Sequence, residues 1–180
     1  MSKDVETPPL SRKVRAADIE ENVPLAIDAT RAEMTSIAAL LGLASLDNLN
    51  LDYRLRLGGQ GRVQLTGRLK ANVTQTCVVS LDPIEASIDV PVAVEFWPAP
   101  LIADLESRVE DPRQSGLLDW PEAIVDGTLD LGPVIYETLA TALDPYPKRE
   151  GASFEWSQGG VEPEDGESGP FAALKQLKEP

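Results

Sequence analysis

Alternation of apolar and polar side chains from Leu49 to Phe96 is the feature that most constrains the fold of this chain. Successive side chains of a strand point to opposite faces of a sheet, so a run of period two has one apolar face. Three such runs follow one another, separated by Gly58-Gly59-Gln60-Gly61 and by Asp82-Pro83, which are both turn sequences. The pattern predicts a meander of three long antiparallel strands that buries one face.

The opposite face of the first two runs is basic. No Asp or Glu lies between Tyr53 and Leu81, and if the apolar faces of the two strands coincide, five cations share the solvated face. Such a face either protects a sheet against edge pairing or forms a contact surface for phosphate or an acidic partner. Both interpretations stay open, and the candidate RNA-binding or partner-binding residues are Arg54, Arg56, Arg62, Arg68 and Lys70.

The third run differs in two ways. Its solvated face is acidic, with Glu85, Asp89 and Glu95. Pro91 has no amide hydrogen for the ladder, so we expect this strand to lie at an edge of the sheet, or to bulge, at that residue.

Two helices are expected beside the sheet. Thr30 and Glu33 form a capping box and Gly42 a C-terminal stop, which predicts a helix over residues 31–41. Its modest apolar stripe comprises Ala32, Ile37, Leu40 and Leu41. Asp130 is a suitable N-cap for a second helix, which ends before Asp144-Pro145. Its apolar side comprises Leu131, Val134, Ile135, Leu139 and Ala142.

These elements predict an α+β fold with a mainly antiparallel sheet and at least two packing helices. The length suits a single domain over residues 10–149, after a flexible N-terminus of residues 1–9. Short strands are expected near residues 10–14 and 118–125. Residues 97–116 show neither periodicity and contain three prolines, which predicts a mobile acidic loop. Residues 150–180 predict an acidic disordered tail.

The end of this tail returns to apolar residues. Phe171, Leu174 and Leu177 recur every three residues, beside Lys175 and Lys178. A helix of about nine residues is marginal in water, so we expect the segment to dock, either on the domain or on a partner.

Composition excludes several functions. The net charge of −14 disfavours a general nucleic-acid binder, because phosphate is repelled at long range. The absence of His excludes imidazole catalysis, and a lone Cys77 cannot form a thiolate cage for zinc. No metal, cofactor or catalytic residue is therefore expected, and Cys77 is interpreted as a small buried apolar residue. No run of 18 apolar residues exists, so we expect a cytoplasmic protein without membrane contact.

Three motifs follow one another along the chain. They are Gly67-Arg68-Leu69 leading into the run from Gln75 to Pro83, the run from Leu129 to Pro147, and the run from Gly169 to Lys178. Together they resemble the YceD family, whose members are described as large ribosomal RNA subunit accumulation proteins. The terminal motif looks like that of alphaproteobacterial members. Many relatives carry a C-x-x-C pair, whereas this chain has Cys77 and then Ser80, so the resemblance does not extend to a metal or redox role.

The resemblance implies a bacterial, cytosolic, non-enzymatic protein that is needed for accumulation of the large-subunit ribosomal RNA. The expected partners are this RNA, or a pre-ribosomal particle, and a ribosomal protein. The alternative from another class is an acidic adaptor or chaperone that binds a basic ribosomal protein through tracts such as residues 104–111 and 162–167. An enzyme acting on RNA is disfavoured by the missing His and the absence of a phosphate-binding loop.

Overall fold

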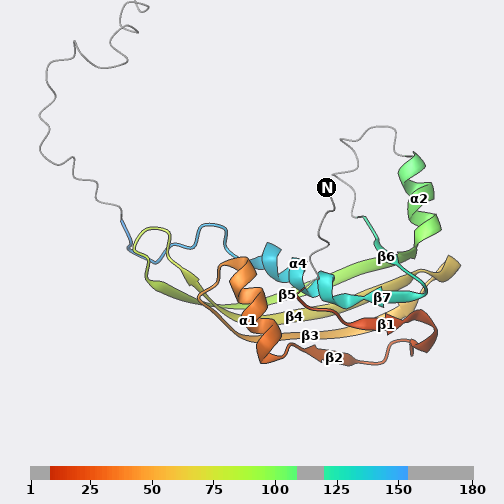
Figure 1. Cartoon of the computed structure of the whole chain (residues 1–180), viewed down its shortest axis with the longest axis horizontal. Helices are drawn as coiled ribbons and strands as arrows, with labels where there is room; N and C mark the ends of the chain where they lie inside the picture. The colour runs from red at the N-terminus through yellow and green to blue at the C-terminus, as the bar shows by residue number, and fades with distance from the viewer. Residues whose placement is uncertain (1–8, 109–119, 154–180) are drawn as a thin grey trace, which may run out of the picture.

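The computed structural model describes residues 9–108 and 120–153 (Figure 1). Residues 1–8 of the predicted N-terminus, residues 109–116 of the predicted loop, and residues 154–180 of the predicted tail, with Phe171, Leu174 and Leu177, lie outside the described residues. The elements are β1 (Lys13–Arg15), β2 (Leu25–Asp28), α1 (Arg31–Leu41), β3 (Ser45–Leu57), β4 (Val63–Thr76), β5 (Pro83–Pro98), α2 (Ala99–Arg108), β6 (Glu122–Ile124), β7 (Thr128–Asp130) and α4 (Leu131–Ala142).

Two sheets form from these strands. The larger has the order β2-β3-β4-β5-β6, with antiparallel pairing from β2 to β5 and a short parallel pairing of β6 with β5. The smaller pairs β1 with β7, antiparallel. The predicted α+β class and the meander of three long strands are therefore confirmed.

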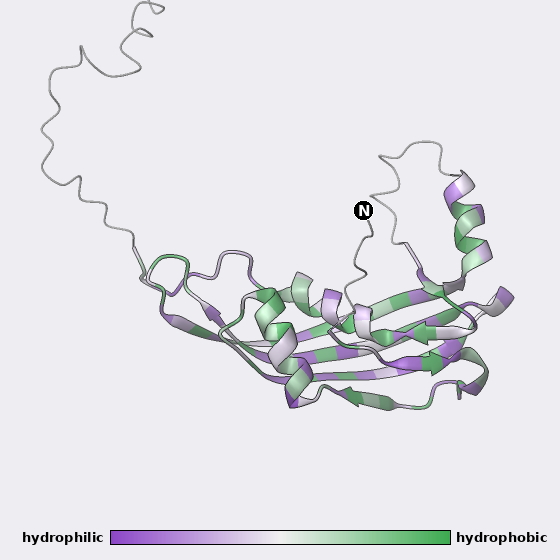
Figure 2. Ribbon diagram, viewed as in Figure 1, coloured by the Kyte–Doolittle hydropathy of each residue, from purple (hydrophilic) through white to green (hydrophobic). Residues whose placement is uncertain are grey.

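The apolar faces of the three long strands coincide, as expected. Leu51 of β3 lies opposite Leu69 of β4, which lies opposite Val90 of β5. Figure 2 shows the resulting alternation of hydrophobic and hydrophilic bands along the strands. We call this apolar side the inner face and the opposite side the outer face.

Helices α1 and α4 supply the other half of the core. Ile37 of α1 and Leu139 of α4 are fully buried, in one cluster with the inner-face side chains of the sheet. The predicted apolar side of α4 is confirmed. The stripe expected on α1 is confirmed at Ile37, which is buried, and Leu41 is partly buried. It is wrong at Ala32 and at Leu40, which is 57% exposed, because the helix turns Ala38 toward the sheet beside Ile37.

Both helix starts follow the sequence prediction. Thr30 and Glu33 form the capping box of α1, and Gly42 ends the helix with a left-handed φ of 65°. At α4, the Asp130 carboxylate accepts a hydrogen bond from the Gly132 amide at 2.9 Å. A Cβ at Gly132 would lie 2.0 Å from the Leu10 carbonyl oxygen, so only glycine allows the chain before β1 to pass this close.

Polar side chains join the two helix starts to the chain before β1. Asp130 accepts hydrogen bonds from the Ser11 hydroxyl at 2.6 Å and the Arg12 amide at 2.7 Å. The Arg12 guanidinium donates to both carboxylate oxygens of Glu33, at 2.6 and 2.8 Å. We call Ser11, Arg12, Thr30, Glu33 and Asp130 the N-terminal clasp. It ties three segments that are far apart in the sequence.

The predicted acidic loop is wrong for its first part. β5 continues to Pro98, and residues 99–108 form α2. The prediction took the prolines as evidence against a helix. Pro100, however, lies in the first helical turn, where no amide donor is needed. Leu101, Ile102 and Leu105 are the residues of α2 that are partly buried, a helical spacing too short to stand out in the sequence.

Pro91 confirms the expected edge. It lies opposite Arg68 on β4, whereas β6 pairs with β5 only from Phe96 to Pro98. Among the described residues, none pairs with the other side of β5 at Pro91. No helix of the described residues is long and apolar enough to cross a membrane.

The clasp generates a prediction of pH-dependent stability. The hydrogen bond from Arg12 holds the pKa of Glu33 at about 2, below its ordinary value of 4.5. A lowered pKa stabilises the fold above the ordinary value, and this stabilisation is lost as the pH falls toward 2. Glu33→Gln should therefore lower the free energy of unfolding by about 1–2 kcal/mol at pH 7, and by less as the pH approaches 2.

Denaturant unfolding between pH 7 and pH 2 checks this. Glu20→Gln, at an exposed position outside the clasp, serves as the control and should change stability little at any pH. A loss for Glu33→Gln that stays constant from pH 7 to pH 2 would show that the carboxylate charge contributes nothing.

Candidate functional site

The five candidate cations lie on the outer face of the meander or at its edge. Arg54 and Arg56 of β3 lie opposite Thr66 and Gln64 of β4, and Arg68 and Lys70 extend the same face along β4. Arg62 precedes β4 at the hairpin end. The register therefore brings together the residues that the sequence singled out.

Neighbouring strands neutralise two of these cations. Lys70 forms an ion pair with Asp52 of β3 at 3.2 Å, and Arg68 pairs with Asp89 of β5. All four side chains are about half exposed, so each pair contributes at most about 1 kcal/mol. The acid-free run of the sequence thus does not produce an acid-free surface, because adjacent strands supply the carboxylates.

Arg54 and Arg56 differ from that pair. In residues 9–108 and 120–153, neither is part of an ion pair. Arg54 lines a hollow of about 550 Å³ together with Thr66 and Arg68. A Cβ at Gly67, which also lines the hollow, would lie 2.4 Å from the Asp52 carbonyl oxygen. Gly67 therefore lets β3 and β4 approach closely at this point.

Arg62 stacks on an aromatic ring. Its guanidinium carbon lies 3.8 Å from the centroid of the Trp97 ring. The Trp97 indole donates a hydrogen bond to Glu95 at 2.8 Å, and Arg62 donates to Gln60 at 3.3 Å. Nε of Arg62 is buried without a partner among the described residues. The sequence analysis did not single out Trp97. The odd-numbered residues of β5 lie on the outer face, so the alternation could have placed Trp97 there.

These residues can bind anions and base rings. The guanidinium groups of Arg54 and Arg56 and the hydroxyl of Thr66 can bind phosphate oxygens. The stacked pair of Arg62 and Trp97 can bind base rings. In the described part of the chain, no group of three or more His, Cys, Asp or Glu side chains is arranged to hold a metal.

A second polar arrangement surrounds Cys77, in the turn between β4 and β5. Its side chain is buried, as expected of a small apolar residue. Its Sγ, however, accepts backbone hydrogen bonds from Arg149 at 3.4 Å, Ser80 at 3.4 Å and Val79 at 3.5 Å. The bond from Arg149 contributes most to lowering the pKa of the thiol to about 6. No local pattern in the sequence indicates this hydrogen bond to the thiol, since Arg149 is 72 residues from Cys77.

The turn also holds the chain that follows α4. The Val78 amide donates to the Pro147 carbonyl at 2.9 Å, and Arg149 donates to the Asp82 carboxylate at 3.0 Å. Hydrogen bonds from Ser80 and then Arg149 lower the pKa of Asp82. Cys77 is thus an acceptor that fastens residues 147–149 to the sheet.

Replacing Cys77 should test this role. Cys77→Ala leaves three amides without their acceptor and should lower Tm by about 2–4 °C or more. Because the pKa of the folded thiol is lowered, its stabilisation is present at alkaline pH and lost as the pH falls through 6. The Tm difference between the native protein and Cys77→Ala should therefore grow from pH 5.5 to pH 8.5.

Calorimetry across that pH range is the measurement. Cys77→Ser keeps an acceptor that does not titrate, so its Tm difference from Cys77→Ala should stay constant. A difference between native protein and Cys77→Ala that is also independent of pH would show that the thiolate does not form in the fold.

Comparison with known proteins extends these observations. No curated protein and no solved structure matches the chain. Residues 65–178 match the family model described as large ribosomal RNA subunit accumulation protein YceD. The match includes Arg68, Lys70 and Cys77 and begins after Arg62. It covers 114 of the 180 residues (178 − 65 + 1), which is more than half. The chain therefore belongs to the YceD family, as its motifs had indicated.

Proposed function

We infer that this protein is a non-enzymatic accessory factor for the accumulation of large-subunit ribosomal RNA. It acts in the cytoplasm and contacts the RNA, alone or in a pre-ribosomal particle, through the outer-face cations. The family description supports the role in RNA accumulation. The observation that carries the contact is the pair of arginines, Arg54 and Arg56, that have no carboxylate partner among the described residues.

Electrostatics limits such a contact to a small area. The net charge of −14 repels phosphate, but salt largely screens this repulsion beyond about 8–10 Å, the screening length at physiological salt. At closer range, Arg54 and Arg68 both line the hollow, so a phosphate there could accept from Arg54 and, in exchange for Asp89, from Arg68. The exposed pairs of Arg68 and Lys70 are weak enough to exchange a carboxylate for a phosphate oxygen.

The stacked pair of Arg62 and Trp97 adds a second mode of contact. Single-stranded RNA bases stack on aromatic rings and on guanidinium planes. A base on this pair would lie at the end of the sheet where Arg56 and Gln64 face solvent. The two modes together favour a single-stranded segment over a duplex, whose bases are already stacked.

A second candidate function is an acidic adaptor for a basic ribosomal protein. The net charge favours it, and so do the outer-face carboxylates of β5, Glu85, Asp89 and Glu95. Of the acidic tracts considered for this role, residues 104–108 belong to α2, whereas residues 109–111 and 162–167 lie outside the described residues. Such an adaptor would shield the partner until it meets RNA.

The salt dependence of RNA binding separates the two candidates. Each phosphate contact with single-stranded RNA contributes about −0.7 to the slope of log affinity against log salt. The double substitution Arg54→Gln/Arg56→Gln should therefore flatten this slope by about 1.4 and weaken binding to large-subunit RNA. Solvated strand residues change stability by less than about 0.5 kcal/mol, so the fold should be unaffected.

The matched control is Lys13→Gln/Arg15→Gln, which removes the same charge from exposed residues of the smaller sheet. It should leave the slope unchanged. If Arg54→Gln/Arg56→Gln also leaves both the slope and co-sedimentation with precursor particles unchanged, the outer face does not contact RNA. Affinity purification at low salt with and without nuclease then tests the adaptor, which predicts capture of a ribosomal protein that resists nuclease.

A further inference from the structure

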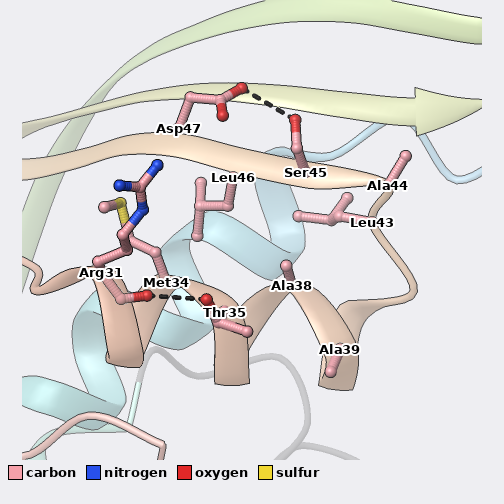
Figure 3. Close-up of a pocket in the computed structure, with 10 residues that line it drawn as sticks. All are labelled: Arg31, Met34, Thr35, Ala38, Ala39, Leu43, Ala44, Ser45, Leu46 and Asp47. Atoms are coloured by element: carbon pink, nitrogen blue, oxygen red, sulfur yellow. Dashed lines mark hydrogen bonds between the residues drawn. The ribbon is translucent and has the colours of Figure 1, made fainter.

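A groove of about 620 Å³ lies between α1 and the start of β3 (Figure 3). Ala38 and Leu46, both buried, form its floor, and Met34 and Leu43 line its walls. Alanines at positions 38, 39 and 44 leave space where longer side chains would fill it. Six of the ten residues that line the groove are thus apolar, and the polar ones, such as Arg31 and Asp47, lie at its rim.

The groove continues toward the point where the described chain ends. A second hollow, of about 390 Å³, shares Leu43 with the groove and is lined by Val78 and Pro147. The hydrogen bond from Val78 to Pro147 fixes the chain here, six residues before Ser153, the last described residue. The last described residues thus lie beside the turn between β4 and β5, which borders the second hollow through Val78 (Figure 1).

Exposed apolar side chains gather at the same end of the molecule. The described residues include seven large exposed apolar side chains. Four of them lie on α1, on the turn between β4 and β5, or after α4: Leu40, Val78, Leu81 and Tyr146. Such a concentration around an apolar groove indicates a surface that a partner segment covers.

We propose that the occupant of this groove is the C-terminal segment of the same chain, with Phe171, Leu174 and Leu177 as its apolar anchors. Residues 154 to 170, hence 17 residues, connect it to the fold. A random coil of that length spans about 21–25 Å. The second hollow, which shares Leu43 with the groove, borders the chain at Pro147. Lys175 and Lys178 complement Asp47 on the rim and Asp144 beside the hollow.

Chain connectivity favours this occupant over a separate molecule. A short tether gives the attached segment an effective concentration in the millimolar range. A segment too short to hold a helix alone can therefore dock here without high intrinsic affinity. The family match also extends to residue 178, so the family pattern includes this segment. The inference is independent of RNA binding.

Photo-crosslinking of the full-length chain tests the inference. Benzoylphenylalanine in place of Phe171 should give a product of monomer mass, cross-linked to residues within 31–47. A product of dimer mass would assign the groove to a second copy, and cross-links confined to residues outside 31–47 and the adjoining hollow, or none, would overturn the proposal.

A groove variant gives an independent readout. Ala39→Glu, at an exposed position on the groove rim, should lower the cross-link yield by about tenfold or more, because docking would desolvate the carboxylate. Ser36→Glu, exposed on α1 away from the groove, is the matched control and should keep the yield. Equal yields in the two variants would overturn the proposal, and circular dichroism shows that both variants remain folded.

Discussion

One-sided burial of the long meander is the constraint on which the rest of this structure depends. Three strands of 13 to 16 residues bury most of their inner face, with Ala86, Val90 and Val94 of β5 partly buried, and leave the outer face to solvent. An antiparallel sheet of this kind needs a cover on its apolar side. Helices α1 and α4 provide that cover, and the N-terminal clasp sets both helix starts against the chain before β1.

The outer face follows from the same register. Each strand places its charges beside those of its neighbour, so Asp52 and Asp89 meet the cations of β4. Ion pairs of this kind stabilise a sheet slightly. They also neutralise Arg68 and Lys70, so the basic stripe produces little positive potential at a distance. What remains available is the end of the face near the hairpin loop, where Arg56 lies opposite Gln64, and Arg62 rests on Trp97. A protein with a large negative charge can thus keep a small cationic contact area.

Local patterns predicted much of this fold, and contacts between distant residues account for what was missed. Period-two alternation specified β3, β4 and β5, and the capping residues Thr30 and Asp130 specified two helices. Short strands such as β2 and β7, by contrast, owe their existence to pairing with a remote segment, which no local pattern carries. The same holds at the candidate site. The five cations were visible in the sequence, but the carboxylate of Asp89 and the ring of Trp97 come from the next strand.

Pro91 has a consequence for association of the chain with itself. The edge of β5 that faces away from β4 is unpaired over most of its length among the described residues. Such an edge is a template for pairing with another strand. An incoming strand needs a regular row of amide donors. Pro91 removes one near the middle of that row, and Asp89 and Glu95 on the same strand repel a second copy that carries the same charges. Pro91 and these carboxylates thereby protect the edge of β5 against edge-to-edge aggregation, to which a long meander with an unpaired edge strand is prone.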